Sequence, residues 1–270
     1  MISRYDVAFS QCAARKEAAF IPFAVAGDPD IAVSESILRT YLDAGADVLE
    51  IGYPFSDPVA DGPVNQRAGI RAIAAGLNHA RFFSLISKIR AITDVPIGIL
   101  LYANTIRHLG YEQFCKKAAS AGIDSLLVAD MPPEEAGELT KAMRRHDIGT
   151  VFIASELTPP DRIKFICKQI DAFVYVVSRL GPTGVQTGLS NTVKPTLDRL
   201  RTHTDKPLCV GFGLSRPEHV RDVVKAGADG AIVGSALVQT IETCAAGPRL
   251  MLQKLLKQTR ALKSATHLRS

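Results

Sequence analysis

The sequence lacks the cysteine pattern of a disulfide framework or a metal site. Only five of its 270 residues are cysteines, an odd number, and none are spaced like metal-binding pairs. They are Cys12, Cys115, Cys167, Cys209 and Cys244. We interpret them as reduced thiols in a cytosol and assign them no chemistry.

Long apolar runs are absent as well. The longest apolar stretches have only the length of a strand, and Arg4 and Asp6 interrupt the segment where a signal peptide has its apolar core. We therefore expect a cytoplasmic protein without a membrane span.

Acidic residues are absent beyond Glu242, so part of the formal net charge of +5 is concentrated near the C-terminus. Leucines at helical spacing alternate with basic residues over residues 249–269, and no aromatic residue lies among them. This pattern favours a closing helix with a solvated cationic face over a membrane or nucleic-acid surface. The residues concerned are Arg249, Leu250, Lys254, Leu255, Lys257, Arg260, Leu262, Lys263 and Arg269.

No linker-like or low-complexity segment divides the chain, which we therefore predict to be one domain over residues 1–270. Three segments repeat one pattern, in which a glycine ends a helix, an aspartate turns the chain and a short apolar run forms a strand. They read AGADVLEIG from Ala44, AGIDSLLVAD from Ala121 and AGADGAIVG from Ala226.

Further strand-like runs bring the predicted number of strands to eight, and helical patterns separate them. The runs occupy residues 19–26, 96–102, 150–154, 172–177 and 207–211, and clear helical patterns occupy residues 80–92, 133–146 and 216–227. Eight alternating units predict parallel pairing through right-handed crossovers, and therefore an α/β fold of the (βα)8 TIM-barrel type. An open doubly wound sheet is the alternative, since strand order is not visible in the sequence.

An extra N-terminal helix is expected over residues 2–12. It would cap the floor of the barrel with the side chains of one face, which are Ile2, Tyr5, Phe9 and Cys12.

The stretch LEIGYPFSDPVADGP, residues 49–63, places three carboxylates at or just after a buried strand. In a TIM barrel the active site forms at this end of the strands. Glu50 is therefore either half of a structural ion pair or a carboxyl whose apolar surroundings raise its pKa and let it deliver a proton. Asp57 and Asp61 could be ordinary turn residues, and their position directly after Glu50 favours a functional role.

Other aspartates after strands have simpler explanations. Asp28 and Asp30, in GDPD, precede a helix that starts near Ile31, so we interpret both as N-capping residues. Asp130 is either catalytic or, as we prefer, holds the following MPPEE turn.

Three glycine-bearing loops follow the last strands and predict a phosphate site. They are RLGPTGVQTG (179–188), GFGLS (211–215) and the pair Gly234 and Ser235. Glycine lets the backbone approach an anion, and TIM barrels commonly bind phosphate at these loops. The first loop could also act as a lid, with Thr183 bonding a carboxylate on closure. Apolar residues on or near strands, either core or pocket lining, are Phe23, Leu100, Leu127 and Phe212.

Taken in order and spacing, these motifs resemble the tryptophan synthase alpha chain family over nearly the whole sequence. The motifs are LEIGYPFSDPVADGP, LLYAN, LLVADMPPEE, SRLGPTG, GFGLS and ADGAIVGSA. The resemblance implies retro-aldol cleavage of indole-3-glycerol phosphate to indole and glyceraldehyde 3-phosphate, without a metal or organic cofactor in this chain. It also implies an α₂β₂ complex with a beta chain that carries pyridoxal phosphate. The lack of aromatic residues among the C-terminal basic residues argues separately against a nucleic-acid partner.

The resemblance also implies roles for individual residues. Glu50 would be the proton donor to indole C3, and Asp61 would hold the indole N–H. The implied phosphate-binding residues are Gly184, Gly213, Gly234 and Ser235, and the implied substrate-binding residues are Phe23, Leu100, Tyr102, Leu127, Tyr175, Thr183 and Phe212. Tyr53 and Pro182 depart from the family pattern, which bears on loop closure and communication with the beta chain.

Two other functions remain open at this point. One is another phosphate-binding barrel, such as a sugar-phosphate isomerase or epimerase, although the strand carboxylate before FSDPVADGP argues against it. The other is a weakly active barrel that serves mainly as a regulatory partner subunit.

Overall fold

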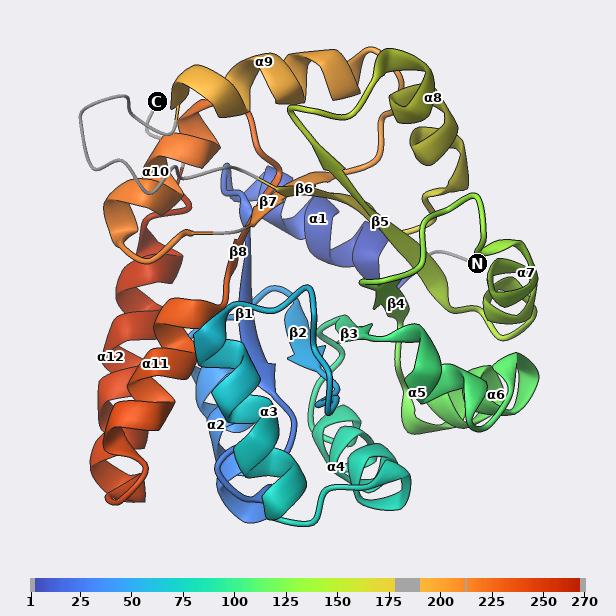
Figure 1. Ribbon diagram of the computed structural model, residues 1–270. Helices are drawn as coiled ribbons and strands as arrows, with labels where there is room; N and C mark the ends of the chain where they lie inside the picture. Colours follow the sequence, from blue (N-terminus) through green and yellow to red (C-terminus); the bar gives the residue numbers. More distant parts are fainter. Residues whose placement is uncertain (1–2, 178–189, 212, 268–270) are drawn as a thin grey trace.

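The computed structural model describes residues 3–177, 190–211 and 213–267. Within them, eight parallel strands close into a barrel in the order β1 to β8 (Figure 1). The strands are β1 (Ala19–Val25), β2 (Leu49–Gly52), β3 (Ile97–Leu101), β4 (Ser125–Val128), β5 (Gly149–Ser155), β6 (Phe173–Val177), β7 (Leu208–Gly211) and β8 (Gly230–Val233). The TIM-barrel prediction is confirmed, and the open sheet is wrong.

Helices follow the strands and cover the outside of the barrel. They are α1 (Arg4–Ala14), α2 (Ile31–Asp43), α3 (Pro63–Ala74), α4 (His79–Arg90), α5 (Ala103–Arg107), α6 (Tyr111–Ala121), α7 (Gly137–Arg145), α8 (Pro160–Gln169), α9 (Ser190–Arg201), α10 (Pro217–Lys225), α11 (Ser235–Cys244) and α12 (Pro248–Ser264). The helical pattern over residues 133–146 is only partly confirmed, because α7 begins at Gly137.

The three repeated joints share a hydrogen bond that explains their sequence. In each, the glycine has a positive φ, between 88° and 102°, which L side chains rarely adopt. The aspartate two residues later accepts a hydrogen bond from the backbone N–H that begins, or nearly begins, the preceding strand. These bonds join Phe20 N to Asp47 Oδ2 at 2.8 Å, Ile97 N to Asp124 Oδ2 at 2.7 Å and Leu208 N to Asp229 Oδ2 at 2.8 Å. The joints therefore fix neighbouring βα units against each other.

The N-terminal helix closes the floor of the barrel, as the sequence predicts. Ser3 and Asp6 form a capping box, so α1 begins at Arg4. Tyr5 is buried, and its hydroxyl lies 2.7 Å from the Ser125 Oγ of β4. Cys12 is buried and Phe9 partly buried, whereas Ile2 lies outside the described residues.

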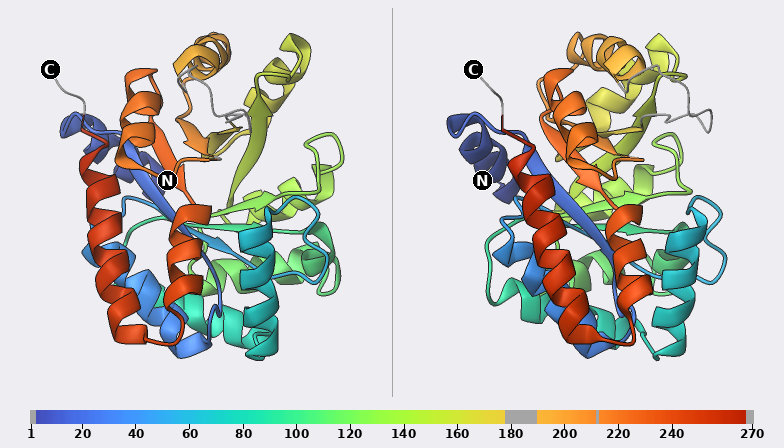
Figure 2. Two further views of the ribbon diagram at one scale, coloured as in Figure 1. Left: turned by 60° about the vertical axis from the view of Figure 1, so that its left-hand side comes forward. Right: turned by 90° about the vertical axis from the view of Figure 1, so that its left-hand side faces the viewer.

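The C-terminal helix packs along the outside of the barrel beside α11 and α2 (Figure 2). Its buried residues include Met251, Leu255 and Leu262, whereas Leu250 is exposed. The closing-helix interpretation is confirmed. In the described part of the chain, no helix is long and apolar enough to cross a membrane, and the five cysteines are free thiols.

The prediction for Asp28 is wrong, because only Asp30 caps α2. The Asp30 side chain accepts a hydrogen bond from Val33 N at 2.9 Å. Asp28 is instead fully buried in an ion pair with Arg71 of α3. Asp130 has a structural role at the start of α5 instead of in the MPPEE turn. Its Oδ1 accepts a hydrogen bond from the backbone N–H of Ala103, the first residue of α5, at 2.7 Å.

Candidate active site

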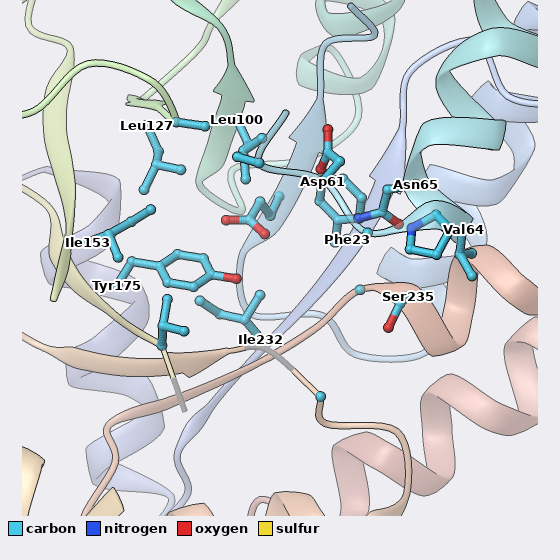
Figure 3. A pocket seen from close by; sticks show the side chains of 18 residues that line it. Phe23, Asp61, Val64, Asn65, Leu100, Leu127, Ile153, Tyr175, Ile232 and Ser235 are labelled. Atoms are coloured by element: carbon cyan, nitrogen blue, oxygen red, sulfur yellow. The ribbon is translucent and has the colours of Figure 1, made fainter. Parts of the chain in front are cut away.

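A cavity of about 320 Å³ opens at the carboxyl ends of the barrel strands (Figure 3). Its lining combines two carboxylates, a ring of large apolar side chains and a glycine-bearing rim. The sequence predicted a site at this end of the barrel, and the structure brings most of the predicted residues together there.

Glu50 faces the barrel interior and lines the cavity. It lies on β2 beside Phe23 of β1 and Gly98 of β3 in the strand register. Its side chain is only slightly exposed, and burial raises the pKa of this carboxyl from its ordinary value of 4.5 to about 8. No described cation forms a salt bridge with Glu50, so the ion-pair alternative finds no support. The geometry favours a carboxyl that stays protonated at neutral pH.

Asp61 lies in the loop between β2 and α3, with its side chain at the cavity wall (Figure 3). The Tyr102 hydroxyl donates to Asp61 Oδ2 at 3.0 Å and accepts from Ala60 N at 3.1 Å. Burial raises the pKa of Asp61, and hydrogen bonds from Tyr102 and Asn65 act in the opposite direction. The Tyr102 hydroxyl therefore fixes this carboxyl at the cavity wall. Asp57 is exposed in the same loop and does not line the cavity, so it is a turn residue.

Tyr102 has a different place from the one expected. It was predicted to bind the substrate, yet it is fully buried and does not line the cavity. Its contact with the site runs through Asp61, which accepts a hydrogen bond from the Tyr102 hydroxyl.

The apolar walls come from several strands. The predicted residues Phe23, Leu100, Leu127 and Tyr175 all line the cavity, from β1, β3, β4 and β6. Ile153 of β5 also lines it and is 40% exposed, which is unusual for a strand residue of this size. Ile153 was not among the predicted site residues. Its position near the end of a predicted strand could have indicated that it lines the site.

Phe23 depends on glycines for its space. A Cβ atom at Gly52 would lie 2.7 Å from Phe23 Cζ, and one at Gly234 would lie 3.4 Å from Phe23 Cδ1. Real Cβ atoms essentially never come as close as the first distance. The ring therefore requires glycine at position 52.

The rim at the last strands has the features of an anion site. Gly213 has a φ of 79°, and Gly234 precedes α11 without a side-chain cap for the helix, which begins at Ser235. All three residues line the cavity. Exposed amides at a helix N-terminus attract phosphate. The other predicted residues of this part, Thr183, Gly184 and Phe212, lie outside the described residues.

A chain of ion pairs connects the helices α3 and α11 beside the cavity. Arg71 of α3 contacts Asp28 Oδ1 at 2.7 Å and Glu242 Oε1 of α11 at 2.8 Å, and Arg67 contacts the same Glu242 oxygen at 2.7 Å. The chain ties α3, which follows Asp61, to the helix that begins at Ser235. No sequence pattern indicates this network, because Asp28, Arg71 and Glu242 are far apart along the chain.

Tyr53, which departs from the family pattern, turns away from the cavity. Its ring packs on Phe82 at a centroid distance of 4.7 Å, and its hydroxyl lies 3.3 Å from His79 Nδ1. It does not line the cavity with Glu50. Pro182, the other departure, lies outside the described residues. Over the described ranges, no group of three or more His, Cys, Asp or Glu side chains could hold a metal ion.

Comparison with known proteins agrees with this geometry. The family model of the tryptophan synthase alpha chain matches residues 9–267. The tryptophan synthase alpha chain of Methanothermobacter thermautotrophicus is 44% identical, with 92% of each chain covered. That of Methanoregula boonei is 42% identical over 98% of this chain and 99% of its own.

Solved structures give the same result. Tryptophan synthase subunit alpha from Legionella pneumophila superposes with a TM-score of 0.90 at 29% identity, covering 98% of this chain and 99% of its own. A chain of Mycobacterium tuberculosis tryptophan synthase superposes with a TM-score of 0.89 at 27% identity over the full length of both. With its barrel, its buried strand carboxyl and these relatives, the chain belongs to the tryptophan synthase alpha chain family and has the role of the alpha subunit in tryptophan biosynthesis.

Proposed function

We propose that this chain is a lyase that cleaves indole-3-glycerol phosphate to indole and glyceraldehyde 3-phosphate. The observation that carries the proposal is Glu50, a buried carboxyl with a pKa of about 8 in the wall of an apolar cavity. A general acid must hold its proton at the working pH and lie beside the atom that receives it. Family membership supports the same reaction.

The reaction begins with proton transfer from Glu50 to C3 of the indole ring. Positive charge then develops on the ring, and Asp61 stabilises it by accepting the ring N–H. The hydroxyl on the carbon attached to C3 loses its proton, and the bond from that carbon to C3 breaks. The electron pair of that bond returns to the ring, and the carbon becomes the aldehyde carbon of the second product.

The phosphate group is proposed to bind the backbone amides around Gly213, Gly234 and Ser235, with Gly184 added by the family resemblance. Measuring the affinity for glycerol phosphate by calorimetry tests this assignment. Because backbone amides do the binding, Ser235→Ala should weaken binding only modestly. Gly213→Val should abolish it, since a φ of 79° strains a branched side chain and Gly213 lines the cavity where the anion is proposed to bind. Equal and negligible effects of both changes would contradict the assignment.

A beta chain that carries pyridoxal phosphate is the proposed partner, in an α₂β₂ complex. Solved relatives of this fold are named tryptophan synthase as a whole, not its alpha chain alone. Val59 and Leu157 support a partner at the mouth of the barrel, because they are 74% and 66% exposed on loops that follow β2 and β5.

A cytoplasmic location is supported by the free thiols.

The decisive experiment follows indole release from indole-3-glycerol phosphate by the unsubstituted chain and by Glu50→Gln. The variant should lose about a hundredfold or more in rate, because general acid catalysis contributes at least that much. Its affinity for glycerol phosphate should stay unchanged, which is the control for folding and phosphate binding. A variant that kept a tenth of the rate would refute the proton-donor role. Repeating the assay with the beta chain separates an active enzyme from a weakly active regulatory subunit.

A further inference from the structure

Asn65 occupies the cavity wall between the two ends of the proposed substrate site. It lies in the first turn of α3, and Figure 3 shows its side chain between those of Asp61 and Ser235. Asp61 is the proposed partner of the indole ring, and Ser235 belongs to the proposed phosphate site. Nothing in the sequence motifs pointed to this residue.

The side-chain amide of Asn65 lies near Asp61, and its oxygen has no hydrogen-bond partner among the described residues. The amide lies close enough to Asp61 to lower the pKa of that carboxyl, and a carboxylate attracts the donor end of an amide. Its Oδ1 is buried and has no hydrogen-bond partner within the part of the chain that the structure describes. A buried acceptor without a partner is unfavourable, so this oxygen is suited to a donor that a ligand brings.

The neighbouring side chains do not compete for this oxygen. Val64 is apolar, and the Gln66 side-chain nitrogen donates to the backbone oxygen of Asp61 at 2.9 Å. Asn65 therefore keeps an unpartnered acceptor on this wall, as far as the described residues show.

The donors of the proposed substrate can be assigned by elimination. The ring N–H is bound by Asp61, and an ionised phosphate only accepts hydrogen bonds. The two hydroxyls of the three-carbon chain between ring and phosphate are the remaining donors. The position of Asn65, between Asp61 and Ser235, matches the position of that chain.

We propose that Asn65 is a specificity-determining residue whose Oδ1 accepts a hydrogen bond from a hydroxyl of the glycerol chain of the substrate. The proposal rests on the proposed function and deepens it, because it names the part of the ligand that this wall recognises. A site that hydrogen-bonds a hydroxyl discriminates against the analogue that lacks it.

The test compares two ligands that differ only in the hydroxyls. These are indole-3-glycerol phosphate and indole-3-propanol phosphate, with dissociation constants measured by calorimetry. The substrate is measured on the Glu50→Gln background so that it is not consumed. Asn65→Leu removes both polar ends at nearly the same volume, and Val64→Ala is the matched control on the same wall. Circular dichroism melts verify that the variants fold.

Asn65→Leu should weaken binding of the hydroxylated ligand by about three- to tenfold more than binding of the deoxy analogue, as expected for one neutral hydrogen bond. The loss of the contact with Asp61 affects both ligands alike and cancels in this ratio. Val64→Ala should leave the ratio unchanged.

An equal loss for both ligands, or no loss for either, would overturn the proposal, because Asn65 would then serve only packing or Asp61. Failure of the unsubstituted chain to bind either ligand would refute the proposed function, and with it this inference.

Discussion

Glu50→Gln should stabilise the protein at neutral and alkaline pH while it abolishes the proposed activity. Burial raises the pKa of Glu50 from 4.5 to about 8. Above pH 4.5 the unfolded chain releases this proton and the folded chain keeps it, so the folded state binds more protons and stability falls as the pH rises. The contribution is fully present below pH 4.5 and is lost as the pH passes through about 8. Each pH unit within this window removes about 1.4 kcal/mol, or about 5 kcal/mol across all of it.

Glutamine resembles the protonated carboxyl in size and polarity and cannot ionise. The free energy of unfolding of the variant therefore lacks this decrease with rising pH. The assay is urea unfolding at pH 5 and at pH 8 for both proteins, followed by circular dichroism because the chain has no tryptophan. The free energy of unfolding of Glu50→Gln relative to the unsubstituted chain should rise by about 4 kcal/mol between the two pH values. A difference that stays constant within about 1 kcal/mol would show that the pKa of Glu50 is not raised, and the proton-donor argument would lose its basis.

Three further substitutions test the surroundings of the site. Tyr102→Phe should lower the rate of indole release by about tenfold or more, because Asp61 loses a hydrogen bond, and glycerol phosphate affinity should not change; an unchanged rate would contradict the role of the tyrosine. Gly52→Ala should cost about 1–3 kcal/mol of unfolding free energy and raise KM, because its Cβ displaces the Phe23 ring toward the cavity; a normal KM would refute this packing argument. Arg71→Met should cost about 3–5 kcal/mol at pH 7 and less at pH 4, since it leaves a buried carboxylate unpaired until that group is protonated; a loss that does not depend on pH would count against it.

The barrel and its main carboxyl were predictable because both follow from local pattern. The glycine–aspartate joints repeat at three places, and each fixes a helix end and a strand start within a few residues. Glu50 was predictable because a charged residue within an apolar strand near the barrel mouth has few favourable orientations. In both examples the sequence neighbours of the residue supply the constraint.

The positions that were misread or missed depend on contacts between distant segments. Asp28 resembles an N-cap in sequence, yet its partner Arg71 lies 43 residues away. Tyr102 directly follows β3, as a pocket residue would, and only the fold brings Asp61 of the preceding βα loop to its hydroxyl. Asn65 follows a proline in a helical first turn, where an asparagine carries no distinctive pattern. Such residues become visible only when the fold brings their partners to them.

The closed floor of the barrel restricts how protons reach Glu50. Below this carboxyl the interior is filled by the buried side chains of Tyr5, Ile21, Val48, Val151 and Phe173. The void that remains there is about 10 Å³, no more than one water needs. Once substrate fills the cavity above, the described side chains below Glu50 leave room for at most one water. The proposed cleavage suits this confinement because it is proton-neutral: the ring carbon takes up one proton and the glycerol hydroxyl releases one, so a turnover can be completed with the protons already enclosed.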